Sequence, residues 1–168
     1  MDALRMWRDL AMEQQPVPRD ALELYRQAIA VGFDGRWDEA EPVLVRCLPL
    51  LEEAGVPEAA AVNHNLAALL MARGDRDGAI FHCIRGLFIY NKAGDVGGLY
   101  CTLRNLAIIH EARGEKRLAR TARHETERAR RELQHRGQLR AVEVGRDSRG
   151  EPLRLLKEPR AGSRSQAI

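Results

Sequence analysis

The chain has 168 residues, of which 45% are hydrophobic, 30% charged and 5% aromatic. This composition predicts a soluble globular protein with one domain or one short repeat array, and it excludes a chain that is disordered throughout or embedded in a membrane. Ala, Leu, Arg and Glu dominate, which favours helices over an all-β sandwich or barrel. The net charge of +3 is unevenly distributed: residues 1–115 carry −5 and residues 116–168 carry +8.

Residues 2–14 form the first predicted element, a helix. Leu4, Trp7, Leu10 and Ala11 recur at helical spacing as an apolar stripe, and the prolines at positions 16 and 18 interrupt the helix. The start of the chain has neither a basic leader nor an uninterrupted apolar stretch, so we expect no secretory signal. No stretch approaches the length that spans a bilayer, so we expect no membrane insertion.

The central part of the chain contains an internal repeat. Gly35, Gly74 and Gly114 lie 39 and 40 residues apart, each with an alanine seven residues before it and another five residues after it. The second and third copies are identical at six of eleven positions over residues 65–75 and 105–115. A helix rich in Ala and Leu ends at the glycine, and an acidic residue opens the next helix. Such a repeat indicates stacked helical hairpins.

The repeat divides the chain into a helical domain, residues 1–136, and a basic tail, residues 137–168, which we expect to be partly ordered or disordered. The repeats span about residues 20–54, 57–93 and 96–136. Their paired helices are predicted at residues 20–33 and 37–54, 57–73 and 76–93, and 96–113 and 116–136. In the tail, residues 142–144 and 153–155 flank a glycine-containing turn and predict a marginal β-hairpin or a loop. Residues 158–168 are expected to be disordered unless a partner holds them.

Residues 20–136 resemble the tetratricopeptide repeat (TPR) family, in particular the extended repeats of kinesin light chains and LGN-type cell-polarity adaptors. The resemblance is carried by the longer period and by the phrases Glu39-Ala40-Glu41-Pro42, Asn65-Leu66-Ala67 and Asn105-Leu106-Ala107. The aromatic residue that the family has after the turn glycine is present as Trp37 but is replaced by Arg76 and Lys116 in the later copies. The resemblance implies an all-α helical-hairpin repeat solenoid, a TPR-like superhelix of about seven helices with an irregular or β-hairpin C-terminal tail.

The family likeness also implies a concave groove lined by the first helix of each hairpin. Asn65 and Asn105 occupy the same position in two copies, and in the relatives such asparagines hydrogen-bond the backbone of an extended peptide. The alternative is that they bond a helix terminus or water. Arg26 takes this position in the first copy, and with His64 and Arg104 it could meet a ligand carboxylate. The candidate groove residues are Tyr25, Arg26, Ile29, His64, Asn65, Ala68, Met71, Arg104, Asn105, Ile108 and Glu111.

The last repeat helix is rich in arginine. Its candidate basic surface comprises Arg117, Arg120, Arg123, Arg128 and Arg131. Three interpretations stay open, in decreasing order of preference: a solvated capping face, a docking surface for an acidic protein, and a contact for nucleic acid. Interleaved glutamates and the lack of a stacking aromatic residue place the third last.

The sequence offers little support for catalysis. The five histidines never form an HExxH motif, and Cys47, Cys83 and Cys101 contain no CxxC pair, so we expect no metal, no cofactor and no disulfide framework. These cysteines fit a reducing cytoplasm. We therefore expect a non-catalytic adaptor that binds a protein or an extended peptide, including an acidic one. The alternatives are a scaffold that assembles with its own copies, and a regulatory or nucleic-acid-associated factor that uses the arginine-rich end.

Overall fold

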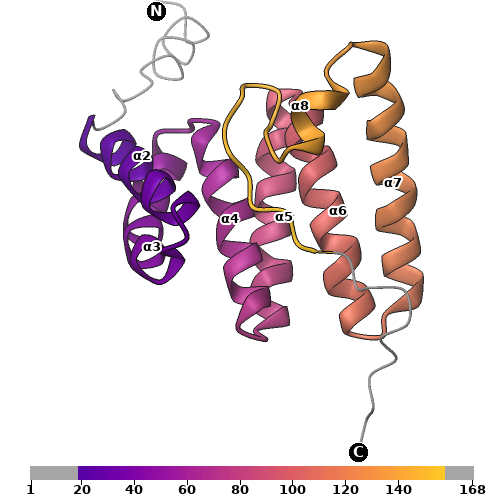
Figure 1. The fold of residues 1–168 in the computed structure, drawn as a ribbon, viewed down its shortest axis with the longest axis horizontal. Coiled ribbons are helices and arrows are strands. Elements are labelled where there is room, and N and C mark those ends of the chain that lie inside the picture. The colour runs from indigo at the N-terminus through magenta and orange to yellow at the C-terminus, as the bar shows by residue number, and fades with distance from the viewer. Residues whose placement is uncertain (1–18, 158–168) are drawn as a thin grey trace, which may run out of the picture.

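The computed structural model describes residues 19–157, and all of its regular elements are helices (Figure 1). The predicted helix at residues 2–14 and the expected disorder of residues 158–168 lie outside these residues. Seven helices are present in the described range: α2 (Arg19–Phe33), α3 (Trp37–Glu53), α4 (Glu58–Ala72), α5 (Arg76–Ala93), α6 (Val96–Ala112), α7 (Lys116–His135) and α8 (Leu139–Glu143). The first six match the predicted helices to within a residue or two at each end.

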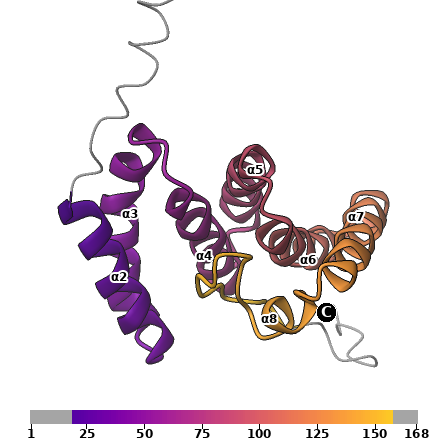
Figure 2. The same ribbon diagram turned by 90° about the horizontal axis from the view of Figure 1, so that it is seen from above.

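The helices pack in chain order as three hairpins. Contacts join α2 to α3, α4 to α5 and α6 to α7 most extensively, and each hairpin also contacts the next one. Seen from above, α4 and α6 lie on the side that carries α8 and the C-terminal residues, whereas α5 lies on the opposite side (Figure 2). One face of the hairpin stack is therefore covered by the end of the described chain.

The repeated glycines stop the first helix of a hairpin. Gly74 has a φ of 86°, a left-handed conformation that costs a residue with a side chain about 1 kcal/mol or more. Its N–H donates to the carbonyl of Met71, and the N–H of Asp75 donates to that of Leu70, which together form a Schellman motif. The Asp75 side chain then accepts from the N–H of Gly78 at 2.9 Å and caps α5. The sequence signal for helix, stop and new helix thus has a direct structural cause.

Two apolar clusters fill the interior. The larger cluster extends from Tyr25 and Leu44 in the first hairpin to Val142 and Leu153 after the last one. The smaller cluster includes Leu106 of α6, and Leu156 packs against it. The C-terminal residues are therefore part of the core, because they bury apolar area that the hairpins leave open.

The tail has no β-hairpin within the described residues, so that alternative is wrong and the irregular one holds. Residues 142 and 143 belong to the short helix α8, and one isolated bridge pairs Arg146 with Pro152. Proline has no N–H to extend a ladder. Beyond Pro152 the chain stays extended, because its main-chain groups bond to side chains of α4 and α6 rather than to a second strand.

Candidate functional site

The two repeated asparagines bind an extended main chain, and that chain is the protein's own C-terminal segment. Asn65 on α4 is fully buried. Its Nδ2 donates to the carbonyl oxygen of Pro152 at 3.1 Å, and its Oδ1 accepts from the main-chain N–H of Arg154 at 2.7 Å. The amide side chain therefore pairs with the peptide as the edge of a strand does.

Asn105 on α6 repeats this arrangement two residues further along. Its Nδ2 donates to the carbonyl oxygen of Arg154 at 2.9 Å, and its Oδ1 accepts from the N–H of Leu156 at 2.9 Å. Asn105 is also fully buried. The segment thus advances by two residues between equivalent positions of adjacent hairpins. We call residues 151–157 the C-terminal arm (Figure 1, where it runs across α4 and α6).

His64 supports the same carbonyl group. Its Nε2 lies 3.0 Å from the carbonyl oxygen of Arg154, which can only accept, so Nε2 carries the proton. Nδ1 then accepts from the hydroxyl of Thr102 at 2.9 Å. Complete burial lowers the pKa of His64 to about 4 because a charged ring loses its hydration. Two donors, one from α4 and one from α6, therefore converge on one main-chain oxygen of the arm.

The arm side chains occupy distinct environments. Leu153 is 2% exposed and belongs to the larger core cluster, against which Leu155 also packs. The guanidinium of Arg154 lies over the ring of Trp37, with its Cζ 5.1 Å from the ring centroid. Burial lowers the pKa of Arg154, and the negative charge of Asp38 opposes that effect. The surface that the arm covers therefore has apolar subsites and one aromatic, acidic subsite that suits a cation.

A tight turn fixes the chain before the arm. We call residues 139–150 the anchor. Asp95, the N-cap of α6, accepts from the N–H of Gly98 at 2.8 Å and from that of Ser148 at 3.1 Å, both on Oδ1. The hydroxyl oxygen of Ser148 in turn accepts from the N–H of Gly97 at 2.9 Å. A Cβ on Gly97 would lie 2.6 Å from the Ser148 nitrogen, so only glycine allows this close approach.

Two acidic residues complete the connection between anchor and arm. Asp147 is 2% exposed, and its Oδ1 accepts from the N–H groups of Arg149 and Glu151, each at 2.9 Å. Burial raises its pKa to about 6, and the neighbouring charge of Asp95 adds to this effect. Glu151 accepts from the hydroxyl of Tyr25 at 2.7 Å. That bond ties the arm to α2 of the first hairpin.

The structure brings only some of the candidate groove residues to the arm. Tyr25, His64, Asn65 and Asn105 bond to it directly. Four further candidates on α2 and α4 have no hydrogen bond to the arm. Arg26 is exposed, Ala68 is buried, Ile29 shares the larger apolar cluster with Leu153, and Met71 packs on the same smaller cluster as Leu156.

The remaining three candidates on α6 lie toward α7. Arg104 and Ile108 line a small hollow of about 210 Å³ together with Arg123 and Arg130 of α7. Glu111 is exposed and forms an ion pair with Arg123. The candidate residues on α6 thus lie on two faces of that helix, one toward the arm and one toward α7, because a helix with neighbours on both sides shares its residues between them.

The candidate basic surface is interleaved with carboxylates. All five of its arginines are exposed on α7: Arg117, Arg120, Arg123, Arg128 and Arg131. Arg131 pairs with Glu127 one turn earlier at 3.3 Å, and Arg128 pairs with Glu125 at 3.4 Å. Such exposed pairs add about 0.3–0.5 kcal/mol to a helix. They also neutralise charge that a phosphate backbone would need.

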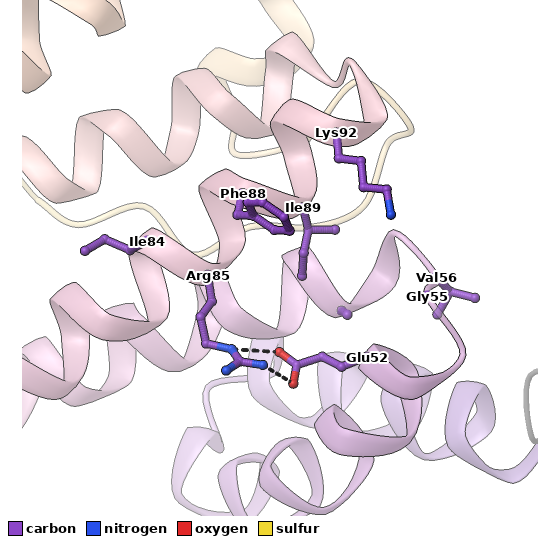
Figure 3. A pocket seen from close by; sticks show the side chains of 9 residues that line it. Glu52, Gly55, Val56, Ile84, Arg85, Phe88, Ile89 and Lys92 are labelled. Atoms are coloured by element: carbon purple, nitrogen blue, oxygen red, sulfur yellow. Dashed lines mark hydrogen bonds and ion pairs between the residues drawn. The ribbon is translucent and has the colours of Figure 1, made fainter.

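A second hollow lies on the opposite side of the hairpin stack from the arm, between α3, α4 and α5 (Figure 3). Its volume is about 520 Å³, and its lining includes Val56, Ile84 and Phe88. Phe88 is 71% exposed. Glu52 accepts from Arg85 at the edge of the hollow, as the dashed lines in Figure 3 show. The surface is apolar with a charged rim.

The described residues contain no cluster of three or more His, Cys, Asp or Glu side chains that could hold a metal ion. Cys47, Cys83 and Cys101 are all buried as free thiols. Burial raises the pKa of Cys47 to about 11 and that of the other two to about 12, which leaves them protonated and unreactive. None of the helices between residues 19 and 157 has the length and apolar character needed to cross a membrane.

Comparison with known proteins leaves the geometry as the basis for assigning a function. No protein-family model matches the chain, and no curated protein or solved structure matches it.

The contacts of the C-terminal arm and anchor were missed from sequence. From the sequence, residues 153–155 are expected only as one side of a marginal β-hairpin or as a loop. A signal for these contacts is present in the pair Gly97-Gly98, because two adjacent glycines at a capped helix start indicate close approach of another chain segment. The short apolar pattern at residues 153–156 was too brief to identify its binding surface.

Proposed function

We propose that this chain is a non-catalytic protein-interaction module that binds extended peptide segments through Asn65 and Asn105. The observation that supports this proposal is the pair of two-point contacts that these side chains make with alternate residues of the arm. The arm stands in for a peptide ligand, because the bonds involve only its main chain. Any extended segment carries the same groups in the same spacing.

The burial of the asparagines supports a binding role over a purely structural one. Each side chain is 0% exposed and directs both of its polar atoms at the arm. A buried amide that loses its partners costs about 1–3 kcal/mol. Each asparagine therefore destabilises the folded chain unless a peptide backbone bonds to its side chain. An apolar residue at either position would leave main-chain groups of the arm without these partners, so the two amides serve an extended backbone and do more than fill space.

The hairpin stack fits a TPR-like solenoid of three repeats, and this architecture forms part of the proposal. Asn65 and Asn105 lie 40 residues apart at equivalent places of α4 and α6. A repeat scaffold presents equivalent side chains at regular intervals along one surface. An extended ligand that bonds to both asparagines advances by two residues from one repeat to the next, as the arm does.

A displayed library of random dodecapeptides tests the proposal. Because the arm covers the groove, the target is the full-length chain with Leu153→Asp, which places a carboxylate in a buried apolar site and releases the arm. We expect selected peptides to lose binding when Asn65→Ala and Asn105→Ala are added. Asn91 is exposed on α5, so Asn91→Ala serves as the matched control and should retain them.

Two outcomes contradict this function. The first is that the library yields no binder although circular dichroism shows an intact helical fold. The second is that the selected peptides bind the double asparagine variant as tightly as they bind the Asn91→Ala control, which would locate their site elsewhere.

A further inference from the structure

The inference rests on the proposed function and names the ligand class and the control of the same groove. We infer that the C-terminal arm is an internal competitor, and that the partner is an extended segment with an apolar, basic, apolar pattern like Leu153-Arg154-Leu155. This segment takes the place of the arm while the anchor stays bound. The chain therefore holds its groove closed until a better ligand arrives.

The arm and the anchor are held by different contacts, which makes their separation physically reasonable. The anchor buries Val142 and Asp147, and Ser148 bonds to both Asp95 and Gly97 at the start of α6. Within the arm, by contrast, only Leu153 is fully buried, and the residues that follow it are partly or fully exposed. The main-chain bonds of the arm to the asparagines can be replaced one for one by another peptide.

Gly150 marks the joint between the two parts. Its φ of 88° is left-handed, and a Cβ placed on it meets nothing within 4 Å. Glycine changes backbone conformation with little steric cost. A swing of the arm at Gly150 breaks the bond of Glu151 to the Asp147 side chain and the main-chain bond of Leu153 to Gly145. The bonds of Ser148 to Asp95 and Gly97 do not involve the arm, so the helix start at α6 keeps them.

The ligand class follows from the subsites that the arm fills. Leu153 enters the apolar cluster shared with α2 and α4, and Leu156 packs on the cluster of α5 and α6. Between them Arg154 stacks on Trp37, with Asp38 close enough to act on its charge. This subsite favours a cation and repels a carboxylate. The groove therefore selects a basic residue here, in contrast to the acidic ligand expected from its arginines.

The tether explains how a weak internal ligand blocks a free one. A short linker gives the arm an effective concentration in the millimolar range. If the arm peptide alone bound with a dissociation constant near 10 μM, the tethered arm would weaken an identical free peptide by on the order of 100-fold. A partner must therefore bind more tightly than the arm sequence, or act at high local concentration.

Fluorescence anisotropy with a labelled nonapeptide tests the inference. The probe has the sequence of residues 150–158, Gly-Glu-Pro-Leu-Arg-Leu-Leu-Lys-Glu. We expect the full-length Leu153→Asp chain to bind it at least tenfold more tightly than the parent does. Val144 lies in the anchor and is 71% exposed, so Val144→Asp adds the same charge without releasing the arm and should behave like the parent.

Two probe variants test the ligand class. Replacing the probe's arginine by glutamate should weaken binding to Leu153→Asp at least tenfold, and replacing its first leucine by aspartate should do the same. Arg154→Glu provides a second opened chain in case Leu153→Asp disturbs the core. It places a carboxylate beside Asp38 at a partly exposed site.

The outcomes separate the inference from the function on which it rests. Equal affinity of the probe for the parent and for both opened chains overturns the competitor role, and equal affinity of the arginine and glutamate probes overturns the ligand class. Both results leave groove binding itself intact. Failure of any folded variant to bind this probe or any library peptide contradicts the proposed function. Hydrogen exchange of the unmodified chain adds a direct check: the Leu156 amide should exchange faster than the Ser148 amide, and equal protection overturns a mobile arm.

Discussion

Asn65 and Asn105, one repeat apart, bind the two main-chain polar groups of the same arm residue, Arg154. The amide oxygen of Asn65 accepts from the N–H of Arg154, and the amide nitrogen of Asn105 donates to its carbonyl oxygen. One arm residue therefore links α4 to α6. Because the groups involved are main-chain groups, the link depends on an extended backbone and not on the identity of the side chain at that position.

The asparagine link leads to the first testable outcome. Asn65→Ala should remove two hydrogen bonds and leave the Pro152 carbonyl and the Arg154 N–H without these partners, at a cost of about 1–3 kcal/mol in the free energy of unfolding. Hydrogen exchange should show faster exchange at the Arg154 amide. Asn91→Ala, at an exposed site, should change stability by less than about 0.5 kcal/mol. Equal effects of the two substitutions on the free energy of unfolding and on exchange of the Arg154 amide would contradict a role of Asn65 in holding the arm.

The glycine at the anchor provides a second outcome. Gly97→Ala should detach the turn, because the new Cβ would lie 2.6 Å from the Ser148 nitrogen. In a helix without that contact, alanine instead stabilises by about 1 kcal/mol relative to glycine. We therefore expect a lower melting temperature than the parent and faster exchange at residues 146–151. Ser148→Ala removes one hydrogen bond without a clash and should have the smaller effect.

The buried histidine makes stability depend on pH. The pKa of His64 is about 4 in the folded chain and 6.5 when exposed, so the unfolded state binds its proton first as pH falls. The stabilising contribution is complete above pH 6.5 and is lost between pH 6.5 and 4, by roughly 3 kcal/mol in total. Urea unfolding should show that His64→Gln loses less stability than the parent between pH 7 and 5. His124→Gln, at an exposed site, is the control.

Asp147 changes the stability of the fold in the opposite direction to His64 over the same pH range. Its pKa of about 6 lies above the ordinary value of 3.8, so the folded state binds the proton first and gains stability as pH falls through 6. Asp147→Asn keeps an acceptor oxygen for the turn but cannot titrate. We expect this variant to lose more stability than the parent between pH 7 and 5. An unchanged pH profile would show that burial does not raise the pKa of Asp147 in the folded chain.

The bond between Tyr25 and Glu151 gives a further outcome. Tyr25→Phe removes the hydroxyl donor to the arm while keeping the ring in the core, so the cost should be about 0.5–1.5 kcal/mol. Release of the arm should then increase binding of the labelled nonapeptide. Glu151→Gln retains an acceptor and should have a smaller effect. If the Tyr25→Phe chain is as stable as the parent and binds the labelled nonapeptide no more tightly, this bond does not hold the arm.

The helices and their limits could be predicted from the sequence because the signals are local. Each of the repeated glycines Gly74 and Gly114 terminates its own helix through hydrogen bonds within six residues. The alanines at fixed distances mark where neighbouring helices come close, and they are buried as this predicts. Hydrophobic periodicity over 15 to 20 residues is also enough to specify a helix.

The site could be predicted only in part. The equivalence of Asn65 and Asn105 follows from aligning the copies, and the structure brings both to an extended backbone. The identity of that backbone could not be predicted, because the bonds join residues 49 to 89 positions apart. Arg104 and Glu111 illustrate the same limit: helical spacing places them on α6, but contact with α7 decides where they face.

The sequence by itself determined an all-helical chain with three repeated units and two equivalent asparagines, because capping, turn and periodicity signals act over a few residues. Only the tertiary structure decided that the C-terminal arm lies against α4 and α6 and bonds to both asparagines. That outcome depends on long-range fit: a glycine that admits the anchor turn, an aromatic ring that receives Arg154, and buried amides that require a partner. These terms are each worth only about 1–3 kcal/mol, and they act together once the hairpins have formed the surface that the arm covers.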